Sequence, residues 1–395
     1  MNSDIIIVAG EPSGDMLAAS ILKSMKEHPF FHNYKFSGIG GPHMQANDFN
    51  SIWNINTLSV RGYVETLGNI FAILKIRKEL LLKLRVDPPR FFFGVDAPDF
   101  NLEIEKKCRK LNIPTFHFIS PSIWAWRGER IYGIKKAVDH MFCIFPFETE
   151  IYKKHGISAT FVGHPLANSI PDQPNQVQAK EKLSLLKLNF GEIKEDETLI
   201  AVLPGSRKSE IKYIAPGFFK AISIMQRTHL GKIRFLIPVA IPLLLPALEE
   251  LKNDTLRENP DVCIELISSN SSLILEACDS VLIASGTATL EAALWKKPMV
   301  ISYTVPWLTA QIMKRKAYLP YVGLPNILLK KFIVPELLQD KALPMNLARE
   351  TLAWLNQPDR VTQLKQEFNR IHQSLKLPTA EVIVDVIEKN ISAYK

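Results

Sequence analysis

The sequence predicts an α/β protein of two Rossmann-like, doubly wound domains that face each other across a cleft, followed by C-terminal helices. Short, β-rich apolar runs alternate with helical segments along most of the chain. These runs are apolar throughout, as expected for strands buried on both faces of a parallel sheet. With 395 residues, 47% of them hydrophobic and 22% charged, the chain can bury two or three cores, which excludes a disordered protein.

The first half contains six expected strands, separated by segments with helical periodicity. They cover residues 4–9, 34–39, 90–95, 115–119, 140–145 and 160–163. After the last of them the pattern changes to HPLANSIPDQPNQVQAK, residues 164–180, in which three prolines and several polar residues interrupt any period. We interpret this stretch as the linker between the domains.

A second series of five expected strands follows the linker, at residues 198–203, 233–239, 262–267, 280–284 and 298–302. We therefore expect a first domain over residues 1–167 and a second over residues 168–360. Residues 361–395 read as helices that pack on the first domain or on a partner subunit, and the sequence leaves both open. No stretch is apolar and long enough to predict a signal peptide or a membrane-spanning helix.

The formal charge of +8 predicts attraction to an anionic partner without identifying it. We expect no nucleic-acid binding, because no recognised nucleic-acid-binding module is present. Residues 63–90 read as a basic amphipathic helix, with six basic and two acidic residues between Lys75 and Arg90. Such a helix can lie on an anionic membrane, but it can equally be an ordinary packed helix with its charges in solvent.

Candidate site residues follow the strands, because open α/β sheets bind ligands beyond the carboxyl ends of their strands. After the first strand, AGEPSGD forms a tight turn in which Glu11 can accept hydrogen bonds from sugar hydroxyls, and Ser13 or Asp15 can cap the next helix. After the third expected strand, in GVDAPDFN, Asp96 is either a general base or a helix N-cap. The sequence leaves these alternatives open. At Glu11 they are a sugar contact or a plain strand-to-helix turn, and at Asp96 they are a general base or an N-cap.

Two tryptophans in SPSIWAWR, Trp124 and Trp126, either line a sugar or acyl pocket or brace a domain interface. His164, at the start of the linker, is either a ligand contact or a packing residue. These alternatives also stay open.

In the second half, LPGSRKSEI places Gly205, Ser206 and Arg207 after a strand, and arginine suits phosphate oxygens. The stretch IASGTATLEAAL lies between a strand and a helix, so its amides predict an anion site. One turn further along this helix, Glu291 can reach ribose hydroxyls. The residues expected at this anion site are Ser285, Gly286, Thr287 and Ala288. A plain helix cap is the alternative.

No metal or other cofactor is expected from the spacing of the residues. There is no DxD pair, no HExxH and no GxSxG.

Taken together, AGEPSGD, GVDAPDFN, SPSIWAWR, LPGSRKSEI, ASGTATLE and GLPN, in this order, resemble the lipid-A-disaccharide synthase family. The resemblance runs from the first strand to at least Asn326 and implies a GT-B glycosyltransferase. Its implied substrates are a UDP-linked diacylglucosamine donor and a lipid monosaccharide phosphate acceptor, 2,3-diacylglucosamine 1-phosphate, and its products are UDP and a β-1,6-linked disaccharide. It also implies a cytoplasmic protein bound peripherally to the inner face of the bacterial inner membrane.

Within this resemblance, Asp96 matches the family's general base and Glu11 its acidic residue of the first loop. Arg207 matches the arginine that handles the donor phosphates, and Asn326 the asparagine of the late LPN motif. We expect an inverting displacement in which Asp96 takes a proton from the acceptor hydroxyl. A UDP-sugar epimerase and a non-catalytic sugar-nucleotide sensor are alternatives, and the sequence does not decide whether the protein is a homodimer.

Overall fold

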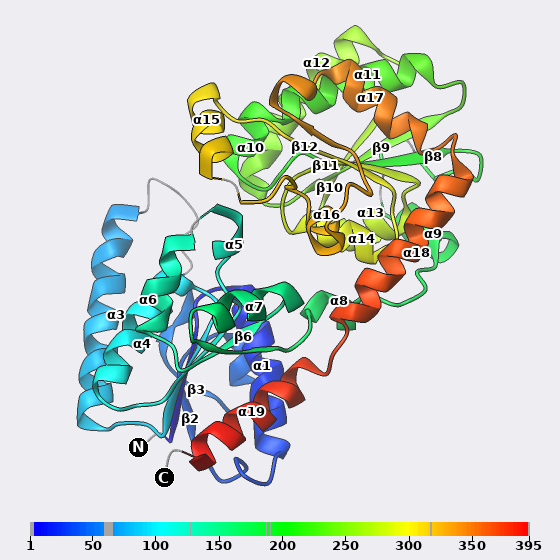
Figure 1. The fold of residues 1–395 in the computed structure, drawn as a ribbon. Helices are drawn as coiled ribbons and strands as arrows, with labels where there is room; N and C mark the ends of the chain where they lie inside the picture. The colour runs from blue at the N-terminus through cyan, green and yellow to red at the C-terminus, as the bar shows by residue number, and fades with distance from the viewer. Residues whose placement is uncertain are drawn as a thin grey trace. The chain divides into compact units, whose positions relative to one another are not determined.

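The computed structural model describes residues 4–58, 66–126, 128–186, 188–189, 191–316 and 318–393, with only the backbone for residues 66–70, 126, 312, 314 and 316. The chain divides into two compact units (Figure 1). The first unit combines Met1–Asn168 with Leu375–Lys395, and the second is Ser169–Ser374. Each unit is an α/β layer structure around its own parallel sheet.

Over its described residues, the first unit contains a seven-stranded parallel sheet in the order β3-β2-β1-β4-β5-β6-β7. Its strands are β1 (Ile5–Ala9), β2 (Phe36–Gly40), β3 (Asn50–Asn54), β4 (Phe91–Val95), β5 (Thr115–Phe118), β6 (His140–Cys143) and β7 (Ser158–Phe161). The six strands expected from the sequence are present within a few residues. The edge strand β3 was not expected, because its sequence NSIWN is mostly polar and never fully buried.

The order of this sheet reverses between β1 and β4. From β1 the chain builds β2 and β3 on one side, and it then crosses to β4 on the other side. The two strands pair in parallel up to their carboxyl ends, where Ala9 lies opposite Val95. The turns that carry Glu11 and Asp96 therefore leave neighbouring strands at the switch point, where ligands of such sheets bind.

Alternating strand residues pack against helices on the two faces of this sheet. One face packs against α1 (Pro12–Glu27) and α19 (Thr379–Ala393), and the other against α3 (Thr66–Val86) and α4 (Pro98–Lys110) (Figure 1). This explains why the strands are apolar throughout. The remaining helices of the unit are α2 (Pro42–Gln45), α5 (Ile123–Trp126), α6 (Ile131–Lys135), α7 (Pro146–Lys154) and α8 (Pro165–Ser169), the last of which ends at the unit boundary.

The described residues of the second unit form a six-stranded parallel sheet in the order β10-β9-β8-β11-β12-β13. Its strands are β8 (Thr198–Leu203), β9 (Ile233–Val239), β10 (Cys263–Ser268), β11 (Ser280–Ala284), β12 (Met299–Tyr303) and β13 (Glu336–Leu338). The five expected strands are again present. Only β13 was not expected, since three residues are too few to show a period.

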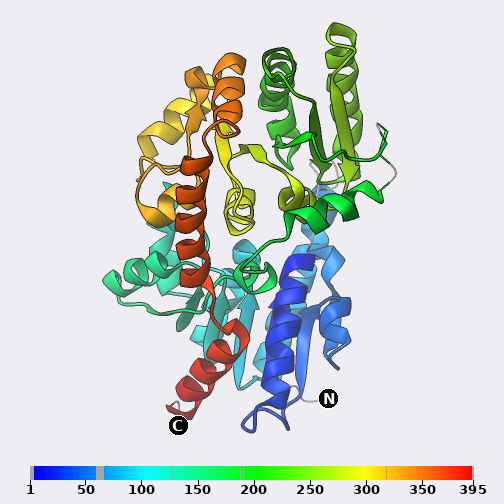
Figure 2. The same ribbon diagram turned by 90° about the vertical axis from the view of Figure 1, so that its right-hand side faces the viewer.

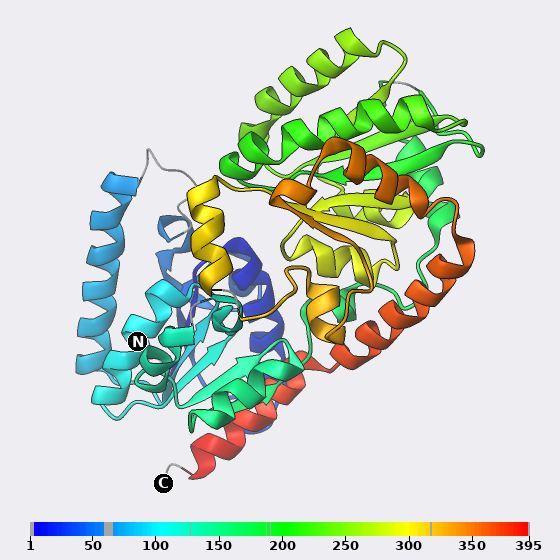
Figure 3. The ribbon, with the colours of Figure 1, turned by 45° about the horizontal axis from the view of Figure 1, so that its top comes forward.

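Helices cover both faces of the second sheet (Figure 3). The helices of this unit, in chain order, are α9 (Gln176–Ser184), α10 (Lys208–Tyr213), α11 (Ala215–Thr228), α12 (Leu245–Glu258), α13 (Ser271–Ala277), α14 (Ala288–Leu294), α15 (Trp307–Lys316), α16 (Leu324–Leu329), α17 (Pro344–Ala353) and α18 (Pro358–Leu375).

The two C-terminal helices belong to different units. Helix α18 lies in the second unit up to Ser374, where Lys296 Nζ lies 2.6 Å from His372 Nδ1. Helix α19 returns to the first unit and packs along α1 (Figure 2). Ile383 and Val384 of α19 are buried in the core there. The expected boundary at residue 360 thus separated α18 from the unit on which it packs.

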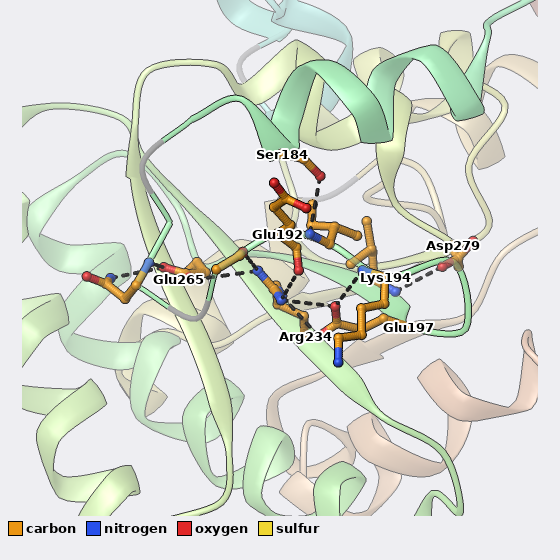
Figure 4. A network of polar contacts seen from close by, with 11 residues as sticks. Ser184, Glu192, Lys194, Glu197, Arg234, Glu265 and Asp279 are labelled. Carbon is orange, nitrogen blue, oxygen red and sulfur yellow. Dashed lines mark hydrogen bonds and ion pairs between the residues drawn. The ribbon is translucent and has the colours of Figure 1, made fainter.

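A buried arginine fixes the segment that leads into the second sheet (Figure 4). Arg234 of β9 makes two hydrogen bonds of 3.0 Å to the carboxylate of Glu197. It also donates to the carbonyls of Gly191 and Glu192. The amide and side chain of Asn189 donate to Glu265, which faces the same guanidinium. Because loss of one partner would leave a buried charge unpaired, this network holds the segment in place at the amino ends of the strands.

Candidate active site

The turn after β1 places Glu11 on the surface at the N-cap position of α1, without a side-chain cap. Asp15 does not cap this helix, contrary to one expectation from the sequence. Its buried carboxylate accepts hydrogen bonds from the amides of Gly41, His43 and Met44, at 2.7, 3.0 and 3.2 Å. Asp15 therefore caps α2 and ties the first turn to the loop after β2.

Asp96 follows β4 in an unusual backbone conformation. Its φ is 55° and that of Ala97 is 45°, so two successive residues with side chains are left-handed. Ala97, and not Asp96, is the N-cap of α4. Among the described residues no hydrogen-bond partner of the Asp96 carboxylate is found, and the side chain is partly exposed. The structure thus rules out the N-cap alternative, and it leaves the carboxylate available for another partner.

The turns of Glu11 and Asp96 pack directly on each other. A Cβ at Gly10 would collide with the methyl group of Ala97. A Cβ at Gly14 would lie 3.7 Å from the Cβ of Asp96. Gly10 therefore leaves no room for a side chain, whereas a Cβ at Gly14 would make only an ordinary van der Waals contact. The structure therefore brings the two acidic residues predicted from the sequence to one edge of the first sheet.

An acidic side chain that the sequence analysis missed supports the neighbouring loop. Glu148 of α7 is 1% exposed, and its carboxylate accepts hydrogen bonds from the indole of Trp124 at 3.2 Å and from the amide of Phe145 at 3.0 Å. Burial raises the pKa of Glu148 to about 7. Half of a sequence signal was present, because glutamate at the third position of a helix can accept the N-cap amide, but the N-cap residue Phe145 is not the serine or threonine of a capping box.

The aromatic residues of this loop form a cluster. Trp124 packs edge-on against Phe145 and Phe147. His164 packs on Phe145, and burial lowers the pKa of His164 to about 4. Of the alternatives left open, the structure thus favours a packing role for His164. The side chain of Trp126 and the whole of Arg127 lie outside the described residues.

In the second unit, the loop after β8 folds around Glu210. The carboxylate of Glu210 accepts hydrogen bonds from the amides of Ser206 and Arg207, at 2.8 and 3.1 Å. Gly205 has a φ of 123°, and its close approach is to the Glu210 side chain. The Arg207 side chain is 75% exposed and makes one ion pair, to Glu210. The loop therefore offers a ligand the guanidinium of Arg207, whereas the amides of Ser206 and Arg207 are already engaged by Glu210.

The loop after β11 offers backbone amides. Ser285 is engaged, because its amide donates to Ser302 and its hydroxyl to Val322. For the amides of Gly286, Thr287 and Ala288, no acceptor is found among the described residues. A Cβ at Gly286 would meet nothing within 4 Å, so this turn borders open space. These three amides at the start of α14 can donate to an anion.

Glu291 and Asn326 have different surroundings. Glu291 of α14 is partly exposed and accepts a hydrogen bond of 2.6 Å from Ser272. Asn326 is fully buried. Its amide group donates to Val334 and Glu336, and its oxygen accepts from the amides of Ile333 and Val334. Since its hydrogen-bonding capacity is used up, Asn326 shapes the loop before β13 and does not present its side chain to a ligand in this structure.

Glu336 was not singled out from the sequence. It accepts hydrogen bonds from the amides of Val322 and Gly323 as well as from Asn326. Burial raises the pKa of its carboxyl. Glu336 thus fixes the loop that receives the hydroxyl of Ser285. Within the described part of the chain, no group of three or more His, Cys, Asp or Glu side chains is arranged to hold a metal ion.

Solved structures with the same fold include sugar-nucleotide enzymes. A UDP-GlcNAc 2-epimerase from Neisseria meningitidis bound to UDP-GlcNAc matches with a TM-score of 0.61 and 12% identity, over 98% of this chain and 100% of the other. The MurG structure of Acinetobacter baumannii matches with a TM-score of 0.56 and 13% identity, over 98% of this chain and 100% of the other. At these identities the likeness shows the fold alone, which is of the GT-B type.

Sequence comparison is more specific. The model of the lipid-A-disaccharide synthetase family matches residues 5–385. The lipid-A-disaccharide synthase of Cupriavidus pinatubonensis is 50% identical over 383 residues, which cover 97% of this chain and 92% of that protein. The enzyme of the same name from Paraburkholderia phytofirmans is 49% identical over 389 residues, covering 98% and 96%. On this evidence, the chain belongs to the lipid-A-disaccharide synthase family.

Proposed function

We propose that this protein is the hexosyltransferase that joins UDP-2,3-diacylglucosamine to 2,3-diacylglucosamine 1-phosphate, giving lipid A disaccharide 1-phosphate and UDP. The observation that carries the proposal is the identity of about half of all residues with lipid-A-disaccharide synthases over nearly the full chain. The fold alone does not favour this activity over an epimerase, since both share it. Membership of the family favours the transferase activity over the epimerase and over the sugar-nucleotide sensor.

Asp96 is the general base of this proposal. Its carboxylate takes the proton of the acceptor 6-hydroxyl while that oxygen attacks the anomeric carbon of the donor. The bond from the anomeric carbon to the diphosphate breaks, and UDP leaves with the electron pair. The support is the position of Asp96 at the switch point of the first sheet and the lack of a hydrogen-bond partner for its carboxylate among the described residues. Glu11, in the adjoining turn, accepts hydrogen bonds from sugar hydroxyls.

The donor binds at the carboxyl edge of the second sheet in this proposal. Arg207 and the three amides of residues 286–288 neutralise the charge that develops on departing UDP. Gly205 and Ser206 form the loop that carries Arg207, and Ser285 fixes the turn of the amides. Glu291 accepts hydrogen bonds from the ribose. We propose that these groups act without a metal ion, because the chain has no DxD spacing. Asn326 supports this edge from within.

We further propose that α3 binds the cytoplasmic face of the inner membrane peripherally, because both substrates are lipids. Its inner face, with Leu80 and Leu84, is buried in the core. Its outer face combines bases with exposed apolar side chains, among them Phe71 at 76% and Val86 at 77% exposure. Membrane-surface helices combine these two features. Residues 63–65 of the expected segment lie outside the described residues, and no described helix is long and apolar enough to cross a bilayer.

The activity is tested by incubating the purified protein with the diacylated UDP donor and the monosaccharide phosphate acceptor. We expect equal amounts of disaccharide and UDP, and neither product when the acceptor is omitted. Release of UDP or formation of an epimer without the acceptor would contradict the transferase. Binding of UDP without consumption of the donor would identify a sensor.

A further inference from the structure

A cluster of three buried polar side chains lies beneath the Asp96 turn. Asn101 and Glu105 are on α4, and His117 is on β5. Each of them is 0% exposed. Nothing in the proposed chemistry requires polar groups at this depth, and burying a polar group costs stability unless the group is hydrogen-bonded.

Asn101 holds the Asp96 turn from the inside. Its side-chain amide donates to the carbonyl of Asp96 at 2.7 Å and to the carbonyl of Val8 at 3.2 Å. Its backbone amide donates to the carbonyl of Ala97 at 3.0 Å. One residue therefore binds the carbonyls of both left-handed residues and joins them to β1, the strand that leads to Glu11.

The turn needs such support. A residue with a side chain is disfavoured at positive φ, because its Cβ approaches the following carbonyl oxygen. Asp96 and Ala97 both adopt this conformation, and neither is a glycine. Conformations of this kind persist only where surrounding contacts impose them, and they concentrate at functional sites. The side-chain hydrogen bonds of Asn101 to the carbonyls of Asp96 and Val8 are suited to impose it, while its backbone bond to Ala97 is one that any residue of the helix would make.

The pair of Glu105 and His117 packs beneath Asn101. Glu105 Oε1 lies 2.7 Å from His117 Nδ1. Burial raises the pKa of Glu105. A Cβ at Gly94 would collide with Glu105 and lie 3.0 Å from the Cβ of Asn101, so the pair and Asn101 fill the space beside β4. Glu105 Oε2, His117 Nε2 and Asn101 Oδ1 find no partner among the described residues, so the cluster is retained at a cost in stability.

We propose that Asn101 is a positioning residue, which holds Asp96 and Ala97 in the left-handed conformation and so sets the direction of the Asp96 carboxylate. The inference rests on the proposed function, in which that carboxylate is the base. Asn101 touches no substrate in this role and acts only through the turn.

The first test compares Asn101→Ala with a matched control, Asn175→Ala. Asn175 also makes a local hydrogen bond through its side chain, as the cap of α9 in the second unit. We expect Asn101→Ala to lower kcat about tenfold to a hundredfold with unchanged KM for both substrates. The control loses thermal stability but keeps its kcat. A wild-type kcat for folded Asn101→Ala would overturn the proposal.

A suppressor separates positioning from general loss of packing. Glycine adopts positive φ without the Cβ penalty, so Ala97→Gly added to Asn101→Ala should recover part of the lost kcat. No recovery would show that the defect lies outside the turn and would overturn the proposal. If Asn101→Ala does not fold, Asn101→Ser replaces it, and its single hydroxyl donor predicts an intermediate kcat.

A structural readout keeps this inference separate from the proposed activity. Hydrogen exchange of peptides spanning residues 94–102 should be faster in Asn101→Ala than in the wild type, whereas exchange in the second unit should not change. Unchanged hydrogen exchange in residues 94–102 would overturn the proposal that Asn101 holds the turn, even if kcat falls. If the wild type makes no disaccharide, the proposed function fails, but the exchange measurement still tests whether Asn101 holds the turn.

Discussion

The carboxylate of Glu210 lies 3.1 Å from the guanidinium of Arg207 and also accepts a hydrogen bond from the backbone amide of Arg207. The arginine that we propose for the donor phosphates thus has an anionic partner within its own loop. With the Arg207 side chain 75% exposed, this ion pair contributes little to stability, about 0–1 kcal/mol. A diphosphate can therefore replace Glu210 as the partner of Arg207 at small cost.

Removal of the guanidinium tests this assignment. We expect Arg207→Ala to weaken UDP binding and to lower kcat, each by about tenfold or more, because the charge-assisted hydrogen bonds to phosphate are lost. Calorimetric titration with UDP and initial rates measure the two effects. Lys208→Ala is the matched control, since Lys208 is the exposed basic neighbour. Normal UDP affinity of Arg207→Ala would remove this residue from the donor site.

Replacement of the proposed base gives a different pattern. Asp96→Asn keeps the shape of the side chain but cannot accept a proton, so we expect kcat to fall by about 10²–10⁴ while UDP binding stays unchanged. Asp99→Asn is the control, because Asp99 lies three residues away in the first turn of α4 and pairs with Arg130 on the surface. Turnover of Asp96→Asn close to that of the wild type would refute the base assignment.

The buried carboxyl of Glu148 predicts a pH dependence of stability. Its pKa is about 7 in the folded protein against an ordinary value of 4.5. A carboxyl with a raised folded pKa contributes stability below pH 4.5, and this contribution is lost as the pH rises through about 7. The loss is on the order of 3 kcal/mol.

Denaturant unfolding across this pH range measures the effect. Relative to Glu148→Gln, which cannot ionise, the wild type should lose stability from about pH 4.5 to 7 and then level off. Glu150→Gln, an exposed change on the same helix, should follow the wild type at every pH. Parallel curves for the wild type and Glu148→Gln would show that Glu148 does not titrate in this range.

The outer face of α3 predicts salt-sensitive binding to anionic vesicles. We expect the double variant Lys75→Glu, Lys78→Glu and the variant Val86→Ser each to weaken vesicle binding severalfold, through lost charge attraction and lost apolar contact respectively. Cosedimentation at low and high salt measures this, and wild-type binding should weaken as salt is added. Leu230→Ser is the control, because Leu230 is a fully exposed leucine of the second unit. Equal binding of all variants would refute a membrane role for α3.

Much of the fold could be predicted from the sequence, because a strand buried on both faces must be apolar throughout, as Phe91 to Phe93 in β4 are. The candidate residues after the strands could be found for the same reason, since parallel strands bring their carboxyl ends to one edge. The strands β3 and β13 were missed because an edge strand needs little apolar character and three residues show no period.

The two series of strands, the resemblance to the family and the positions of Asp96 and Glu11 after strands could be inferred from the chain alone, since they depend on local pattern. Which polar groups are free to bind a ligand depends instead on contacts made in folding. The side chain of Asn326 is fully hydrogen-bonded within its own loop. The amides of Ser206 and Arg207 donate to Glu210. Asn101 reaches Val8, which is 93 positions away in the chain. Hydrogen-bond partners that are far apart in the chain leave no periodic signal in the sequence, so they could be identified only in the folded structure.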